Sequence, residues 1–397
     1  MFRDDNAFGK LVRTYREEHQ WKQEELAERW GFTREYVSQI ERGKRKLDGL
    51  EQVTRLADIL GITEEQLAHV GKKRLPKRPL EVQPSPESND LLLQALLKPA
   101  TSIIKIAWLI WQDSIISTDL IRDLHNLEQR LNEVLGDYYG QFRQSALHLL
   151  SSVHECLGKL AIERTATQEA IMHFQEMYDV AEELGDNDLL ILAMIHQASM
   201  FRRKGRFEAS FRRLEAAGRR ASSAPQWLQG LLWQNYARNF SVYGDEQGFL
   251  RSIDRAESIA EHMEAPAEML TNPFDKVSAL QERALGYTLF WQPEKALAIY
   301  QETDKMRPFR PLRELSSYHI LKAQAYCYHG DLQSGIEHAL TGLHMAEMLQ
   351  SRRYVRRLQQ MCDRLSDKPI SKEPAMQDLY SEILTSWDRL SQLEEGC

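Results

Sequence analysis

Apolar positions in the N-terminal part of the chain recur at helical spacing and predict five short helices. One helix face is formed by residues at i, i+3, i+4 and i+7, namely Phe8, Leu11, Val12 and Tyr15. Further apolar groups predict helices around Leu26–Trp30, Val37–Ile40 and Val53–Leu60, and a last one after Thr63. Thr33 is a suitable N-cap for the third helix, which leaves a polar face opposite its apolar side. These residues predict a small helical domain over residues 1–70.

From residue 91 onward, long amphipathic stretches alternate with short turns, and a strand pattern is almost absent. Five turn positions align at spacings of 40, 39, 47 and 39 residues: Thr165, Gly205, Gly244, Trp291 and Gly330. Seven residues before each turn the residue is small: Gly158, Ala198, Ala237, Ala284 and Ala323. Nine residues after it comes Phe174, Leu214, Ile253, Tyr300 or Ala339. Because a small residue lets two helices approach closely, the period predicts stacked helix pairs, and the fold class is all-α.

Two parts of this body depart from the regular period. A degenerate sixth repeat is expected from Ser351 to about Leu393. The helices expected between residues 91 and 135 are either an irregular first repeat or a dimerisation unit, and both interpretations remain open. The sequence therefore predicts a helical repeat domain over residues 91–397.

Residues 71–90 separate the two helical parts and are rich in proline, lysine and arginine. Proline blocks helix continuation, so this segment is expected to be an extended linker. Residues 1–80 hold 17 Lys+Arg against 14 Asp+Glu, whereas the rest holds 34 against 44. A weakly basic head on an acidic body fits a DNA-binding module joined to a partner-binding module.

The head resembles the Cro/lambda-repressor-like (XRE) helix-turn-helix family almost from end to end. The matching positions keep their order and spacing: Arg13, Arg16, Gln23, Leu26, Ala27, Gly31, Ser38, Gln39, Ile40, Glu41, Gly43, Lys44, Arg45, Ala57, Leu60 and Gly61. Gln20 and Lys22 depart from the family pattern, in which glycine and a Thr or Ser N-cap are usual.

The resemblance implies roles for the polar residues of the head. The helix that starts at Thr33 would lie in the major groove of a DNA operator, and its base-contacting residues would be Arg34, Glu35, Ser38 and Gln39. Phosphate contacts would come from Gln23, Lys44 and Arg45, and Arg16 would form an internal salt bridge with Glu41. The alternative is that this polar face is merely solvated. The carboxylate of Glu35 favours that alternative unless it accepts from a cytosine amine.

The body resembles the tetratricopeptide repeat class, and residues 323–340 are its clearest copy. In that class the first helix of each pair lines a concave groove. The family geometry implies a ligand groove lined by Lys159, Ser199, Arg202, Gln234, Asn235, Arg238, Asn239, Gln281 and Gln324. Gln can pair with an extended peptide backbone, and Arg or Lys can bind a carboxylate. For each residue, a solvated face or a hydrogen bond between repeats remains the alternative.

The sequence lacks the motifs of common enzyme and cofactor sites. It contains no HExxH, GxSxG, Walker or GxGxxG motif, so no enzyme activity and no cofactor are expected. The 12 His and four Cys show no metal-ligand spacing, and no metal site is expected. No signal peptide is visible. The apolar run Ile103–Trp111 contains Lys105, is too short to span a bilayer and is expected to be a buried helix.

Together these patterns predict a cytoplasmic transcriptional regulator that binds a double-stranded DNA operator as a homodimer. The architecture is similar to that of peptide-pheromone-sensing regulators, which implies a short peptide in the groove of the repeat domain. The alternative is a DNA-addressed scaffold that docks another protein. A small-molecule ligand is a third hypothesis.

Overall fold

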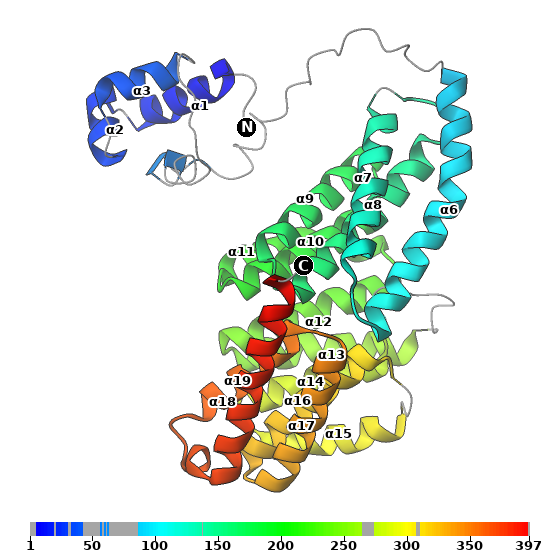
Figure 1. The fold of residues 1–397 in the computed structure, drawn as a ribbon, viewed down its shortest axis with the longest axis vertical. Helices are drawn as coiled ribbons and strands as arrows, with labels where there is room; N and C mark the ends of the chain where they lie inside the picture. The colour runs from blue at the N-terminus through cyan, green and yellow to red at the C-terminus, as the bar shows by residue number, and fades with distance from the viewer. Residues whose placement is uncertain are drawn as a thin grey trace. The chain divides into compact units, whose positions relative to one another are not determined.

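The structure is a computed structural model that describes residues 5–19, 21–30, 33–42, 56–57, 59–60, 62, 86–136, 138–263, 274–306 and 310–395. The chain divides into two compact units, Met1–Gln83 and Pro84–Cys397. Both units are helical over these residues, and no strand is found among them (Figure 1).

The first unit is built around helices α1 (Asp5–Glu18), α2 (Gln23–Trp30) and α3 (Arg34–Glu41). These helices surround an apolar core that includes Val12, Leu26, Trp30, Val37, Ile40, Leu56 and Leu60. Thr33 caps α3, because its side chain accepts a hydrogen bond from the Tyr36 backbone N–H at 3.2 Å. Most of the fourth and fifth predicted helices lies outside the described residues.

The second unit begins with α6 (Pro86–Asp113), followed by α7 (Thr118–Leu135). Residues 86–90, which the sequence predicts as part of an extended linker, are therefore helical. Proline is well tolerated in the first turn of a helix because the N–H that it lacks has no helical partner there. Residues Asn89–Asp113 form one helix that is long and apolar enough to cross a membrane, by length and composition only.

Helix α6 corrects the prediction of a buried helix at Ile103–Trp111. Ala107 and Trp108 are buried against the body, whereas Ile106 and Leu109 are each 54% exposed. The reason is that only one face of α6 packs on the body, mainly on α8, while the run of apolar residues continues around the helix.

Six helix pairs follow α7 and stack into a solenoid (Figure 1). The first helices of the pairs are α8 (Arg143–Glu163), α10 (Asn187–Arg203), α12 (Gln226–Tyr243), α14 (Lys276–Leu289), α16 (Leu312–His329) and α18 (Arg352–Leu365). The second helices are α9 (Thr167–Leu184), α11 (Phe207–Gly218), α13 (Glu246–His262), α15 (Pro293–Met306), α17 (Leu332–Met348) and α19 (Pro374–Glu395). Two short 3₁₀ segments, η1 (Ala221–Ser223) and η2 (Pro369–Lys372), lie in connections.

The five aligned turn positions share one backbone conformation. Each joins the two helices of a pair, and all five have positive φ, including the non-glycine residues Thr165 at 63° and Trp291 at 57°. The small residues seven positions earlier and the residues nine positions later are buried. At Gly158 a Cβ atom would lie 2.5 Å from Phe174, so these two helices approach as closely as glycine allows. The all-α repeat architecture predicted from the period is confirmed.

Candidate DNA-binding face and ligand cavity

Helix α3 presents the polar face that the sequence predicts as the DNA-contacting surface. Val37 and Ile40 are buried in the core of the first unit. Arg34 and Glu35 are exposed, and Ser38 and Gln39 are half-buried. Arg34 Nε lies 3.1 Å from Glu24 Oε1 in an ion pair whose two side chains are both well exposed to solvent. Such an exposed pair costs little to break, so the guanidinium is available to another acceptor.

Behind this face, Arg16 and Glu41 form a buried ion pair. Arg16 Nε and Nη2 donate to the two Glu41 oxygens at 2.5 and 3.1 Å, and Nη1 donates to the Trp21 carbonyl at 2.7 Å. The Gln23 amide also donates to Glu41, at 2.7 Å. This contact turns the Gln23 side chain inward, so a phosphate contact by that amide requires it to leave Glu41. Lys44 and Arg45 lie outside the described residues.

In the second unit, two adjoining cavities of about 320 and 310 Å³ open along the first helices of the pairs. Residues from α8, α10, α14 and α18 line both cavities: Lys159, His196, Ser199, Ser278 and Arg353. The first cavity also has apolar walls, which include Trp111, Phe174 and Pro311. Cavities of this size hold small organic ligands or the end of a peptide.

Cationic side chains dominate the polar lining, and most of them already have an acceptor. Arg238 is paired with Glu282, and Arg353 with Glu163. Arg202 donates to Asn239 Oδ1 at 3.0 Å and to Ser199 Oγ at 3.1 Å. Arg203, which lines the first cavity, forms no ion pair or hydrogen bond with any residue that the structure describes.

Burial and the crowding of like charges lower the pKa values of three of the cations, Lys159, Arg202 and Arg203. Burial and the nearby Arg353 and Arg203 lower the pKa of Lys159 to about 8. Burial and Arg238 lower the pKa of Arg202 to about 9. Solvent reaches part of Arg203, yet desolvation inside the cavity and three other guanidinium groups lower its pKa well below the ordinary value. Charges of one sign held together in a partly dry cavity favour binding of an anion.

The groove residues predicted from the sequence fall into two sets. Those that line a cavity are Lys159, Ser199, Arg202, Gln234, Asn235, Arg238 and Gln281. Asn239 does not, because it is fully buried and bonded to Ser210 and Arg202. Asn239 directly follows Arg238. Because successive residues on a helix are rotated by about 100°, its side chain points away from the cavity. Gln324 is also buried and donates to Tyr328 at 3.0 Å.

Three arginines of the cavity were missed by the sequence analysis. Arg203 was missed because it directly follows the predicted Arg202, and the phase of a helix cannot be placed within one residue from sequence alone. Arg313 and Arg353 belong to α16 and α18, and both bind the buried carboxylate of Glu163. The acid and its partners are separated by 150 and 190 residues, so no local pattern signals them.

Comparison with known proteins identifies the first unit. Residues 7–70 match the family described as helix-turn-helix domain. The first unit carries a helix-turn-helix domain. The match covers the face formed by Arg34, Glu35, Ser38 and Gln39 and supports DNA binding as the role of this domain.

Most of the chain can also be aligned with a solved structure. It is the crystal structure of Bacillus thuringiensis PlcR in complex with the peptide PapR7 and DNA. The two chains are 11% identical, the alignment covers 85% of this chain and 99% of that one, and the TM-score is 0.35. Such a score does not establish a common fold. None of the curated proteins is similar enough to match this sequence.

Proposed function

We propose that this protein is a sequence-specific transcriptional regulator whose helical repeat domain binds a short peptide through its terminal carboxylate. The DNA-binding part rests on the helix-turn-helix match over residues 7–70 and on the polar face of α3. The head carries only a small positive charge, so one head alone gives modest affinity, and two heads on a two-fold operator would supply the rest.

The ligand class follows from Arg203, which is the single observation that carries this part of the proposal. It is a guanidinium without an acceptor among the described residues, in a cavity that also holds the Lys159 ammonium group. A carboxylate would accept charge-assisted hydrogen bonds from the guanidinium and would lessen the repulsion among the neighbouring cations.

The remaining lining fits a peptide better than a free small anion. Trp111, Phe174 and Pro311 offer apolar contacts beside the cations, and Gln234, Asn235 and Gln281 offer amide donors and acceptors for a peptide backbone. The two cavities share five lining residues, so an extended chain can pass from one into the other. Peptide binding would then shift the population between head arrangements that fit the operator and those that do not.

DNA binding is tested by selecting sites from a pool of random duplexes with the full-length protein. We expect Arg34→Ala combined with Gln39→Ala to abolish binding to the selected site, while Gln23→Ala weakens binding to all duplexes alike. The circular dichroism spectrum serves as the control for folding. A double variant that still protects the same site would show that α3 does not contact the bases.

Ligand binding is tested with short synthetic peptides that carry either a free or an amidated carboxyl terminus. We expect only the free acids to bind and Arg203→Gln to weaken that binding by about tenfold or more, as expected for a hydrogen bond between charged groups. Arg212→Gln is the matched control, because Arg212 lies on α11 and is exposed outside both cavities. Equal binding of acids and amides would contradict a carboxylate site.

A second candidate function is a DNA-addressed scaffold that docks another protein. The exposed apolar side chains of α6 favour it: Leu91, Leu92, Ile103, Ile106 and Leu109. Substituting Ile106 and Leu109 by Glu would abolish partner capture under this hypothesis and would leave peptide binding unchanged.

A further inference from the structure

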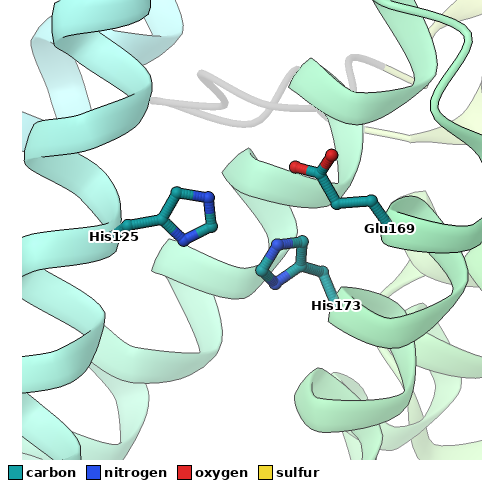
Figure 2. A group of neighbouring side chains, drawn as sticks. All are labelled: His125, Glu169 and His173. Atoms are coloured by element: carbon teal, nitrogen blue, oxygen red, sulfur yellow. The ribbon is translucent and has the colours of Figure 1, made fainter.

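A cluster of histidines and glutamates lies between α7, α8 and α9, outside both cavities. His125, Glu169 and His173 each offer one ligand atom, and these atoms all lie within 4.8 Å of one another. Figure 2 shows the two imidazole rings and the carboxylate around a common gap, with His125 on one side and Glu169 and His173 on the other. No local sequence pattern indicates this group, because its members come from two separate helices, α7 and α9.

One nitrogen of each ring is already held by a neighbouring side chain. His125 Nδ1 lies 2.9 Å from Glu128 Oε2, and His173 Nδ1 lies 3.2 Å from His154 Nδ1. This leaves Nε2 of each ring for the gap. In metal sites the second nitrogen of a ligating histidine is commonly bonded in this way, which fixes the tautomer and the orientation of the ring.

The nitrogen that faces the gap from His173 has no partner. His173 is only 5% exposed, and its Nε2 is buried without any hydrogen bond. A buried polar atom of this kind is costly unless an ion, a water molecule or another group satisfies it. Neutral imidazole is the form that binds metals, and burial lowers the pKa values of His173 and of its neighbour His154, the latter to about 4.

We propose that His125, Glu169 and His173 form a binding site for a zinc-type divalent transition-metal ion, with Glu128 and His154 as supporting residues. Two imidazoles and one carboxylate suit Zn²⁺ and leave a fourth position for water or another ligand. Arg164 donates to Glu169 Oε1 at 2.6 Å, which leaves the other oxygen for the ion and keeps a positive charge nearby. That charge weakens the site, so binding is expected to be reversible.

The repeat itself supplies a comparison for this cluster. His319 and His338 occupy the same positions of a later repeat as His154 and His173, 19 residues apart, with their Nδ1 atoms 2.9 Å apart. There, Ser334 stands four residues after the turn, where the first pair has Glu169, and its hydroxyl donates to Asp331. Among the described residues, that second pair belongs to no group of three metal ligands.

The ion would join α7 to the first helix pair. His125 comes from α7, whereas Glu169 and His173 come from α9. Metal binding is therefore expected to stabilise the start of the solenoid against unfolding. This inference does not depend on the proposed DNA or peptide ligands.

The test is titration of the untagged full-length protein, freed of metal by a chelator, with Zn²⁺ and with Co²⁺. We expect one ion per chain by calorimetry, a higher melting temperature, and the visible absorption of tetrahedral Co²⁺. Ca²⁺, which prefers oxygen ligands, should have none of these effects. His173→Gln should abolish binding, and Glu128→Gln should weaken it by about 10–100-fold.

His338→Gln is the matched control and should bind as the wild type does. Because His173→Gln removes a buried side chain, its folding is checked by circular dichroism, and Glu169→Gln provides a second variant on a partly exposed residue. The proposal is overturned if the wild type shows no saturable binding of either ion, or if folded His173→Gln and Glu169→Gln bind as tightly as the wild type.

Discussion

At the scale of single residues, Glu163 is a buried acid of the second unit with three partners. Its carboxylate accepts from Arg313 at 2.8 Å and from Ser351 at 2.9 Å, and it is also paired with Arg353. Burial alone would raise the pKa of Glu163, but the two guanidinium groups hold it below the ordinary value. The residue therefore couples α8 to α16 and to the start of α18.

We expect Glu163→Gln to lower the free energy of unfolding at neutral pH by about 3–5 kcal/mol, because the buried guanidinium of Arg313 and the partly buried one of Arg353 lose their counter-charge. The pH dependence has a definite sign. A carboxyl group with a lowered folded pKa contributes stability above the unfolded pKa of about 4.5, and that contribution is lost as the pH falls through the folded value. Urea unfolding at several pH values should show the difference between the two proteins shrinking in acid.

Glu208→Gln is the control for this experiment. Glu208 is almost fully exposed and, among the described residues, pairs only with Arg212 at 3.8 Å, so its substitution should leave stability unchanged. If the free energies of unfolding of the wild type and Glu163→Gln differ by the same amount from neutral to acid pH, the stabilising role of the Glu163 charge is contradicted.

Single residues also differ in whether their place in the site can be predicted from the sequence. Lys159, Ser199 and Arg238 follow from their distance to a turn, because each repeat presents the same helix face to the groove. Asn239 was wrongly assigned to the groove and Arg203 was missed, because one residue on a helix corresponds to a rotation of about 100°. The Glu163 cluster and the histidine cluster depend on contacts between distant segments, which no local pattern records.

At the scale of elements, the turn inside five of the six helix pairs contains one residue in the left-handed region. Gly205, Gly244 and Gly330 adopt it without a Cβ, whereas Thr165 and Trp291 do so with one. The Trp291 ring stacks on Tyr328 at 4.1 Å, which compensates for its backbone conformation. For Thr165, which is β-branched, no such ring contact exists among the described residues. The period could be found from sequence because this geometry recurs.

We expect Thr165→Gly to raise the free energy of unfolding by up to about 1 kcal/mol, since left-handed backbone costs an ordinary residue about 1–2 kcal/mol, part of which the more flexible unfolded chain offsets. The reciprocal change, Gly205→Thr, should lower stability by about the same amount. Urea denaturation of both variants and of the wild type measures these two changes in the free energy of unfolding. Changes of the same sign in the two proteins would argue against a backbone cause.

At the scale of the whole molecule, the two units have separate cores, and each unit contains a buried acid that is paired to arginine. Glu41 holds Arg16 in the first unit, and Glu163 holds Arg313 and Arg353 in the second. None of the apolar clusters of the described residues combines side chains from both units. Unfolding is therefore expected to proceed in more than one step, unlike that of a small single domain.

Calorimetry of three full-length proteins tests this independence. We expect the wild type to unfold in two transitions, with Glu41→Gln lowering only the one that belongs to the helix-turn-helix unit and Glu163→Gln lowering only the other. Each substitution should lower the free energy of unfolding by about 3 kcal/mol or more, because a buried cation is left unpaired in either case.

Ligand binding assigns each transition to its unit. Glu41→Gln should lose DNA binding at the lowered temperature of its own transition and should still bind peptides that have a free carboxyl terminus. Glu163→Gln should lose peptide binding at the lowered temperature of the other transition and should still bind DNA. If either substitution shifts both transitions equally, the two units unfold as one body, and a signal bound in the repeat domain would reach the DNA-binding face through direct packing rather than through the arrangement of independent parts.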